Sequence, residues 1–239
     1  MSELLFIILL IICSMSIFFL YKYLDKRGLY FASIILNMIT FILTFKITTI
    51  FKMNTNLGII SYISTLTVVY IYLIKYGKKD INKLLIVSLI TNIVTAIFIT
   101  IMNFYIPAIT ETISINMQGT FEYNYKILFT YPIIMAVSQY IIIKLYSYIA
   151  TLQSNISISL LLTYIITGIL YTIILCVISY INILSIKESV FIGVTTYIMG
   201  LIVTIINIIF INIFLNSKKV IKWEILFWLS SKWLFVILH

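Results

Sequence analysis

Long apolar runs alternate with short polar stretches along almost the whole chain. Each run is long enough to cross the hydrocarbon core of a bilayer, which takes about 20 residues of α-helix. The polar stretches between them are short, as in connections that turn a helix back at a membrane surface. The pattern therefore predicts seven membrane-spanning helices, at residues 4–21, 28–51, 57–74, 84–105, 127–149, 156–181 and 190–214.

The composition agrees with this pattern. With 63% hydrophobic and 10% charged residues and a mean hydropathy of +1.18, the chain has too few polar side chains to coat a soluble domain. Seven glycines and two prolines favour long helices over the short alternating strands of an outer-membrane barrel. We expect one all-α domain over residues 1–217, a polytopic transmembrane bundle with a six-span core and an extra N-terminal helix. Six spans divide into two inverted groups of three, as in many transporters, although the two groups share no sequence similarity.

The basic residues predict the orientation of these spans. If the N-terminus is outside, twelve lysines and arginines fall on cytoplasmic segments and three fall outside, which is the bias that cytoplasmic loops carry. Residues 4–21 have no basic n-region or cleavage site, so we expect this segment to be retained. The net charge of +9 lies beside apolar runs, and we therefore expect anionic lipid headgroups rather than nucleic acid as its partners. The twelve are Lys22, Lys26, Arg27, Lys75, Lys78, Lys79, Lys83, Lys144, Lys218, Lys219, Lys222 and Lys232; the three are Lys52, Lys126 and Lys187.

Two segments leave alternatives open. Lys46 lies about one helical turn from the end of the second run, where its long side chain either reaches the interface or faces a polar cavity. The basic and aromatic tail at residues 218–239 is short for a span and contains three tryptophans, so an interfacial helix is the preferred interpretation over an eighth span.

The chain lacks the side chains that most enzymes and metalloproteins use. No Asp or Glu lies between the predicted interfaces, and the only histidine is the last residue, His239. Cys13 and Cys176 lie inside apolar runs, where a thiol behaves as a small hydrophobic group. We therefore expect no metal, no cofactor and no enzymatic activity, and the absence of a nucleotide-binding loop means that the chain itself cannot use ATP.

Several short motifs occur in an order that resembles the vitamin-uptake-transporter-like family of queuosine-precursor transporters. They are Gly28-Leu29 after a basic loop, Lys46, the NLG motif at 56–58, the YGKK motif at 76–79, Ser138-Gln139 and the TTY motif at 195–197. The resemblance covers roughly residues 21–215. It implies a bacterial inner-membrane carrier that imports a 7-deazaguanine-type precursor.

The chain departs from this family at most of the family's charged or polar positions. Where the resemblance implies acidic residues, this chain has Tyr70, Ile74, Ile142, Tyr171 and Asn207. Phe41 replaces an asparagine, and Gly200 replaces a lysine. Because ionisable groups inside a membrane are costly and usually functional, their joint loss indicates a relaxed or altered function.

Neutral side chains remain as candidates for recognition of a solute. Gln139 is the first, since an amide inside a membrane needs hydrogen-bond partners and can pair with the edge of a heterocycle. Tyr70 and Tyr171 are candidates for stacking on a flat ligand, and bonding between helices or simple packing is the alternative role of each. The candidate binding residues are Gln139, Ser138, Tyr70, Tyr171, Asn207 and Lys46.

These observations favour a membrane transporter for a small, neutral and partly heterocyclic solute. Two other functions stay open: the substrate-binding subunit of an importer with a separate ATPase, and a non-transporting scaffold or regulatory protein. Assembly of the chain with further copies of itself, as a homo-oligomer, also stays open. A water-filled path past Gln139 would distinguish transport from a scaffold whose helices are packed shut at that point.

Overall fold

Helices dominate the computed structural model, which describes residues 2–78, 80–104, 125–153, 155–175 and 184–216. The described residues form α1 (Ser2–Thr44), β1 (Ile47–Ile50), β2 (Met53–Asn56), α2 (Ile59–Tyr76), α3 (Ile81–Phe104), α5 (Tyr125–Leu152), α6 (Ile156–Leu175) and α7 (Ile186–Asn216). The tail at 218–239 and most of the expected external loop at 108–125 lie outside them. The predicted helical class is confirmed for this part of the chain.

Five of the described helices are long and apolar enough to cross a membrane, as expected of a membrane-embedded protein. They are α1, α2, α3, α5 and α7, while the apolar stretch of α6 within the described residues is shorter, at Ile156–Ile169. The expected count of seven spans is therefore not confirmed.

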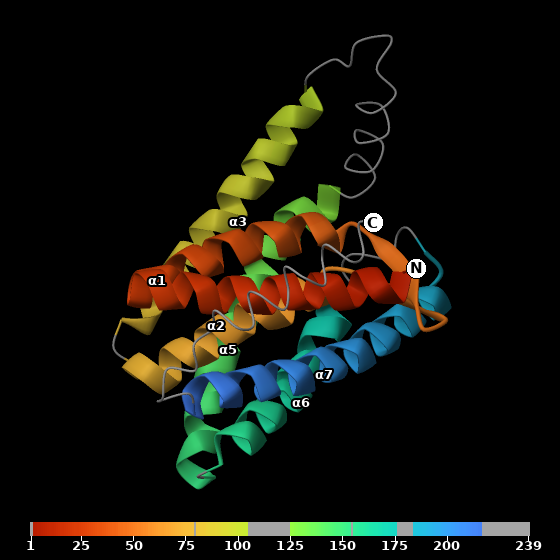
Figure 1. The fold of residues 1–239 in the computed structure, drawn as a ribbon. Helices are drawn as coiled ribbons and strands as arrows, with labels where there is room; N and C mark the ends of the chain where they lie inside the picture. Colours follow the sequence, from red (N-terminus) through yellow and green to blue (C-terminus); the bar gives the residue numbers. More distant parts are fainter. Residues whose placement is uncertain (1, 79, 105–124, 154, 176–183, 217–239) are drawn as a thin grey trace, which may run out of the picture.

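Helix α1 contains the first expected span and most of the second, and it folds back on itself. At Asp25 the backbone leaves the helical region, with φ 47° and ψ −129°. The two halves of α1 then lie side by side (Figure 1). Gly28 makes this close approach possible, because a Cβ atom at position 28 would lie 1.9 Å from the Leu20 carbonyl oxygen.

The second expected span, 28–51, ends earlier than its hydrophobic pattern indicates. Helix α1 stops at Thr44, and an antiparallel hairpin follows in which Ile47 pairs with Asn56 and Ile50 pairs with Met53. Phe51 and Lys52 both have positive φ, as the turn of a two-residue hairpin requires. The run from Ile47 to Ile50 is β-branched throughout and therefore suits a strand, although its hydropathy continues that of the helix.

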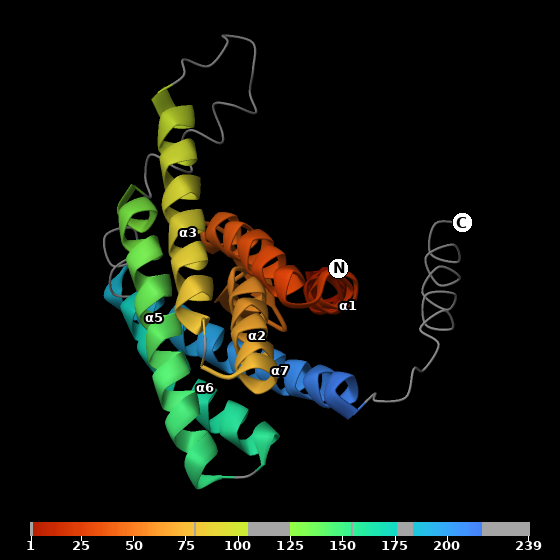
Figure 2. The same cartoon turned by 90° about the vertical axis from the view of Figure 1, so that its left-hand side faces the viewer.

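Helix α2 lies at the centre of the structure. Figure 2 shows it between α3 and α5 on one side and α1 and α7 on the other. Every residue from Ile59 to Leu73 is buried, including seven serines, threonines and tyrosines. Hydroxyls such as those of Ser64 and Thr67 donate to the carbonyl four residues earlier, at 2.9 and 3.0 Å, and so avoid remaining unpaired.

The outer surface of the helices is apolar. Helix α3 alone exposes a row of large apolar side chains, at Ile86, Ile90, Ile93, Val94, Ile97, Phe98 and Ile101. Helices α3 and α5 are in contact and run steeply to α1 (Figures 1 and 2). An apolar exterior around a core rich in hydroxyls and amides is the arrangement that a lipid environment favours.

Two basic connections that are distant in sequence meet at one end of the structure. Lys26, next to the turn in α1, lies 3.2 Å from Asp80 in the connection between α2 and α3. Lys83 lies 2.9 Å from the same carboxylate. The pKa of Asp80 is lowered by its hydrogen bonds to Lys83 and then to Lys26. Asp80 thus ties the turn of α1 to the end of α2.

Substitution of Gly28 by alanine is expected to destabilise the fold, because the added methyl group meets the Leu20 backbone, which cannot rotate away. We expect a loss of about 3 kcal/mol in the free energy of unfolding, measured in detergent micelles. Ile35→Ala, on the exposed surface of the same half of α1, is the control and should lose much less. An equal loss in the two variants would contradict the close approach.

Asp80→Asn is expected to make the thermal stability of the protein vary less with pH between pH 6 and pH 3. The pKa of Asp80 is lower in the folded protein than in the unfolded chain, where it is about 3.9. The ion pairs of Asp80 therefore stabilise the fold at pH values above about 3.9, and this stabilisation is lost as the pH falls through the folded pKa. The parent should therefore be more stable than the variant at pH 6, and the difference should shrink toward pH 3. Thermal unfolding at both pH values measures it, and a constant difference would count against the ion pairs.

Candidate functional site

Five buried polar side chains from three helices meet inside the bundle. We call Ser33, Asn37, Ser88, Asn92 and Gln139 the amide cluster; each has at most 1% of its surface exposed. The Asn37 amide nitrogen donates to the Ser33 carbonyl at 2.7 Å and to the Ser88 hydroxyl at 3.1 Å. The Asn37 oxygen accepts from Asn92 at 3.2 Å and from Gln139 at 3.4 Å. Asn37 is therefore the centre of the cluster and links α1, α3 and α5.

A repeated sequence pattern brings these groups together. Residues 33–37 read SIILN and residues 88–92 read SLITN, so each helix carries a serine and an asparagine four positions apart. This spacing places both side chains on one face of a helix. The two serine hydroxyls lie 2.8 Å apart across the contact between α1 and α3. This repeated pattern is a sequence signal from which the contact between α1 and α3 could have been predicted.

Two oxygen atoms of the cluster have no hydrogen-bond partner among the described residues. They are the side-chain oxygens of Asn92 and Gln139, each on an amide whose nitrogen donates to Asn37. A buried polar atom without a partner costs about 1–3 kcal/mol relative to a satisfied one. Such atoms are uncommon in native structures, and a bound molecule or water is one way to satisfy them.

Buried tyrosines extend the polar interior beyond the amide cluster. The hydroxyls of Tyr62, Tyr70 and Tyr131 are buried and have no hydrogen-bond partner among the described residues. Tyr131 lies edge-on to Phe41, with ring centroids 4.8 Å apart, and its hydroxyl is near Thr44 and Thr40, which lie two turns and one turn beyond Asn37. The hydroxyl of Tyr62 is near Ser138, the neighbour of Gln139. Tyr62 and Tyr131 therefore lie beside the amide cluster, and Tyr70 lies about two turns farther along α2, next to Tyr146, with ring centroids 5.4 Å apart. We call the amide cluster and these tyrosines the polar interior.

Tyr171 and Ser138, two of the predicted site residues, border this region. The Tyr171 ring is stacked on Tyr62 with centroids 3.8 Å apart and planes within 9° of parallel. Ser138 donates to the Met135 carbonyl at 3.1 Å. Together with Gln139 and Tyr70, the structure thus places four of the six predicted residues in one region, and it adds Asn37, Asn92, Tyr62 and Tyr131.

The other two predicted residues lie elsewhere. Asn207 on α7 accepts a hydrogen bond from Ser14 at 2.9 Å and so joins α7 to the first half of α1. Lys46 lies in the connection between α1 and the hairpin and is exposed, so its ammonium does not face an interior polar cavity. The prediction assumed a helix that continues to residue 51 and holds Lys46 inside the membrane. Because α1 ends at Thr44, Lys46 lies outside the helix.

Two motifs that are distant in sequence, NLG and TTY, meet at the hairpin. The Thr196 hydroxyl accepts from the Asn56 backbone at 3.1 Å, and the Thr195 hydroxyl donates to the Asn54 carbonyl. The Asn56 amide donates to the Thr44 carbonyl at 2.7 Å and its oxygen accepts from the Gly58 N–H at 2.7 Å. Asn56 therefore connects the end of α1, the start of α2 and α7.

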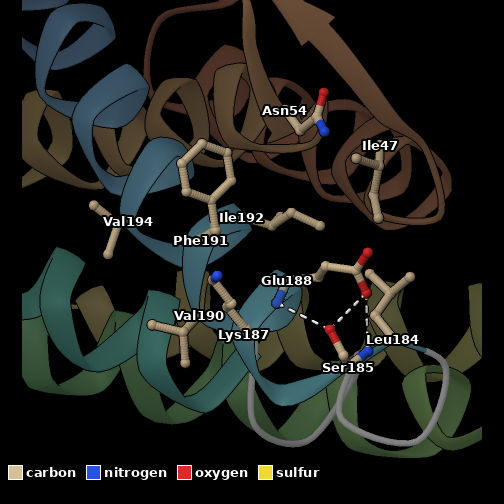
Figure 3. Close-up of a pocket in the computed structure, with 10 residues that line it drawn as sticks. All are labelled: Ile47, Asn54, Leu184, Ser185, Lys187, Glu188, Val190, Phe191, Ile192 and Val194. Carbon is tan, nitrogen blue, oxygen red and sulfur yellow. Dashed lines mark hydrogen bonds between the residues drawn. The ribbon is translucent and has the colours of Figure 1, made fainter.

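A cleft opens next to this hairpin, between its strands and the first turns of α7 (Figure 3). It has a volume of about 820 Å³. Its polar rim includes Glu188, which accepts from the Ser185 hydroxyl at 2.7 Å while its own N–H donates to that hydroxyl, a pairing that caps α7. The lining residues are Ile47, Asn54, Leu184, Ser185, Lys187, Glu188, Val190, Phe191, Ile192 and Val194.

A second, smaller cavity of about 400 Å³ lies between α3 and α5 and is almost entirely apolar, with Ala96, Thr100 and Pro132 among its lining residues. Neither cavity is lined by a member of the amide cluster. In this conformation the amide cluster is therefore closed off from both. The described residues also contain no group of three or more histidine, cysteine or acidic side chains placed to hold a metal ion.

Comparison of the chain with protein-family models, curated proteins and solved structures finds no match. The site is therefore interpreted from its own geometry.

Asn37→Ala is expected to lower the free energy of unfolding by about 2 kcal/mol, because it removes the bonds that join α1 to α3 and α5. Unfolding in mixed micelles measures the change. Asn82→Ala, an exposed asparagine on the first turn of α3, is the matched control and should have almost no effect. Similar effects in both variants would show that the amide cluster does not hold the helices together.

Proposed function

We propose that the chain is a multi-pass membrane transporter whose solute binds at the amide cluster and the adjacent tyrosines. One observation carries this proposal: five buried polar atoms of the interior, in and beside the amide cluster, have no hydrogen-bond partner among the described residues. They are the side-chain oxygens of Asn92 and Gln139 and the hydroxyls of Tyr62, Tyr70 and Tyr131. A region that served only to hold helices together gains nothing from unpaired polar atoms, whereas a binding site needs them.

The chemistry of these atoms favours a neutral solute. The amide oxygens accept hydrogen bonds, and the phenol hydroxyls both donate and accept. None of the five residues is charged, so the region offers no counter-ion to an ionised ligand. The tyrosine rings favour a flat molecule, and the edge of a nitrogen heterocycle presents the N–H donors that amide oxygens require. A small neutral heterocycle fits this set of groups.

The resemblance to queuosine-precursor transporters supports the same class of solute and directs attention to 7-deazapurines. Several positions at which this chain departs from the family lie in the interior, including Phe41, Tyr70, Ile142 and Tyr171, each at most 4% exposed. At Gly200, a Cβ atom would lie 1.8 Å from the Tyr164 hydroxyl, so a tyrosine fills the space that a larger residue would need. We therefore infer a related solute bound without charged partners.

The proposed orientation has the N-terminus outside a bacterial inner membrane and the lysine-rich connections in the cytoplasm. The ion pairs at Asp80 support it, because they place two of the basic connections at one end. In this orientation the hairpin and its cleft belong to the outer end. The proposed activity is not enzymatic. A separate ATPase subunit or a second copy of the chain are the partners that this proposal leaves open.

A non-transporting scaffold is the second candidate, and one observation favours it. Gln139 is completely buried and donates to Asn37, which is the geometry of a bond between helices. Transport requires that this closed arrangement open to water on each side of the membrane in turn. A scaffold requires no opening.

Uptake by cells tests the proposal. Cells that lack their own importer and express the chain should accumulate a labelled 7-deazaguanine precursor and restore queuosine in tRNA. Gln139→Ala should reduce this uptake at least tenfold with unchanged abundance in the membrane, because it removes one of the unpaired oxygens. Tyr140→Ala, the exposed neighbour on α5, should keep normal uptake.

The scaffold interpretation predicts a different result. It expects no uptake by the parent chain and a fall in the abundance of the Gln139→Ala variant, since the lost bond would then be structural. Normal abundance of the parent with no uptake of any neutral heterocycle would refute the proposed transport function.

A further inference from the structure

The end of the structure around Asp80 carries a strong excess of positive charge. Six basic side chains gather there from the turn of α1, the end of α2 and the start of α3, and only two carboxylates accompany them, Asp25 and Asp80. Within the described residues the net charge of this end is therefore +4. We call these basic residues the basic end: Lys22, Lys26, Arg27, Lys75, Lys78 and Lys83.

Two of the six basic residues are already committed to internal contacts. Lys26 and Lys83 share the Asp80 carboxylate, at 3.2 and 2.9 Å. Lys26 also lies over the rings of Tyr72 and Tyr76, with its ammonium 5.5 and 5.6 Å from their centroids. Asp80 therefore fixes the position of the basic end but cannot neutralise it.

Three other basic side chains point outward. Lys22, Arg27 and Lys78 are exposed, and none of them has a carboxylate partner among the described residues. They come from two connections separated by about 50 residues, which the Lys26–Asp80 pair holds together. The geometry thus presents an anchored group of cations to whatever lies at this end.

Apolar and aromatic side chains beside these cations indicate the depth at which they lie. Tyr23 is 73% exposed and Leu24 is 43% exposed, directly between Lys22 and the turn at Asp25. Tyrosine prefers the boundary between hydrocarbon and headgroups, and the exposed apolar surface of α1 and α3 continues from this point. The cations therefore lie at the level of lipid phosphates rather than in open solvent.

We propose that the basic end binds the phosphate headgroup of an anionic phospholipid, through Lys22, Arg27 and Lys78. The opposite charge of the headgroup and its position beside exposed Tyr23 and Leu24 favour a lipid over a soluble phosphate or an acidic protein. This lipid holds the turn of α1 against the connection after α2, on the same side as the Asp80 ion pairs. The inference is independent of whether the chain transports a solute.

Native mass spectrometry of the purified full chain, titrated with phosphatidylglycerol or phosphatidylcholine, tests this site. We expect tighter binding of phosphatidylglycerol and a loss of that preference in high salt, because exposed charges are screened. Each basic side chain near an anionic lipid contributes a factor of about five, so the variant Lys22→Gln, Arg27→Gln, Lys78→Gln should bind it roughly 100-fold more weakly. The charge-preserving variant Lys22→Arg, Arg27→Lys, Lys78→Arg should keep the affinity.

The matched control removes the same amount of charge from the other end of the helices. Lys46→Gln, Lys52→Gln, Lys187→Gln changes three exposed lysines at and beside the hairpin and should leave phosphatidylglycerol binding unchanged. Equal weakening in both triple variants, or no preference of the parent for phosphatidylglycerol, would overturn the proposal. Competition by glycerol phosphate at equal concentration would reassign the site to a soluble phosphate, and retained lipid affinity in the first variant would reassign the surface to another partner.

Discussion

Hydrocarbon offers no hydrogen bonds, so every polar group inside this bundle must find its partner within the protein. The hydroxyls of Ser64, Thr65 and Thr67 on α2 satisfy this constraint locally by donating to the carbonyl of the preceding turn. The amides of Asn92 and Gln139 bond across helices to the Asn37 oxygen, while the Asn37 nitrogen donates both to the carbonyl of the preceding turn and to Ser88 on α3. Asn37 therefore bonds to all three helices α1, α3 and α5, and the Ser33–Ser88 pair adds a second link between α1 and α3.

The same constraint gives the unpaired atoms their meaning. If the interior were arranged only for stability, apolar side chains of similar shape would serve as well as Gln139 or Tyr62 and would avoid the cost of desolvation. The structure instead retains amide oxygens and phenol hydroxyls that face no partner within the described residues. In the proposed function, these atoms are the ones that pair with a neutral solute. The closed state, with Gln139 completely buried, then corresponds to a conformation in which neither side has access.

Much of the fold follows from hydropathy and charge. The basic break at residues 22–27 predicted where α1 turns back, and the lysines after Tyr76 predicted the end of α2. The hairpin was not predictable from hydropathy, because Ile47–Ile50 is as apolar as the helix before it. Its second strand is bonded to Thr195 and Thr196 on α7, which come from a distant part of the chain. Gln139 was identified because an amide is rare in such a segment. The serine and asparagine spacing shared by residues 33–37 and 88–92 was a signal for Asn37, whereas the contact between Asn37 and Gln139 depends on how α5 packs, which sequence alone does not provide.

Access of water to the interior is the most direct test of the account. Ser138 lies beside Gln139 and Tyr62, and Ser138→Cys in a chain without Cys13 and Cys176 places one reactive thiol at the proposed site. Its rate of modification by a small polar thiol reagent, in vesicles of known orientation, reports whether the region opens. The account predicts slow modification that a bound neutral heterocycle slows further. No modification from either side, with the protein folded and in the membrane, would contradict it and identify the region as closed packing between helices.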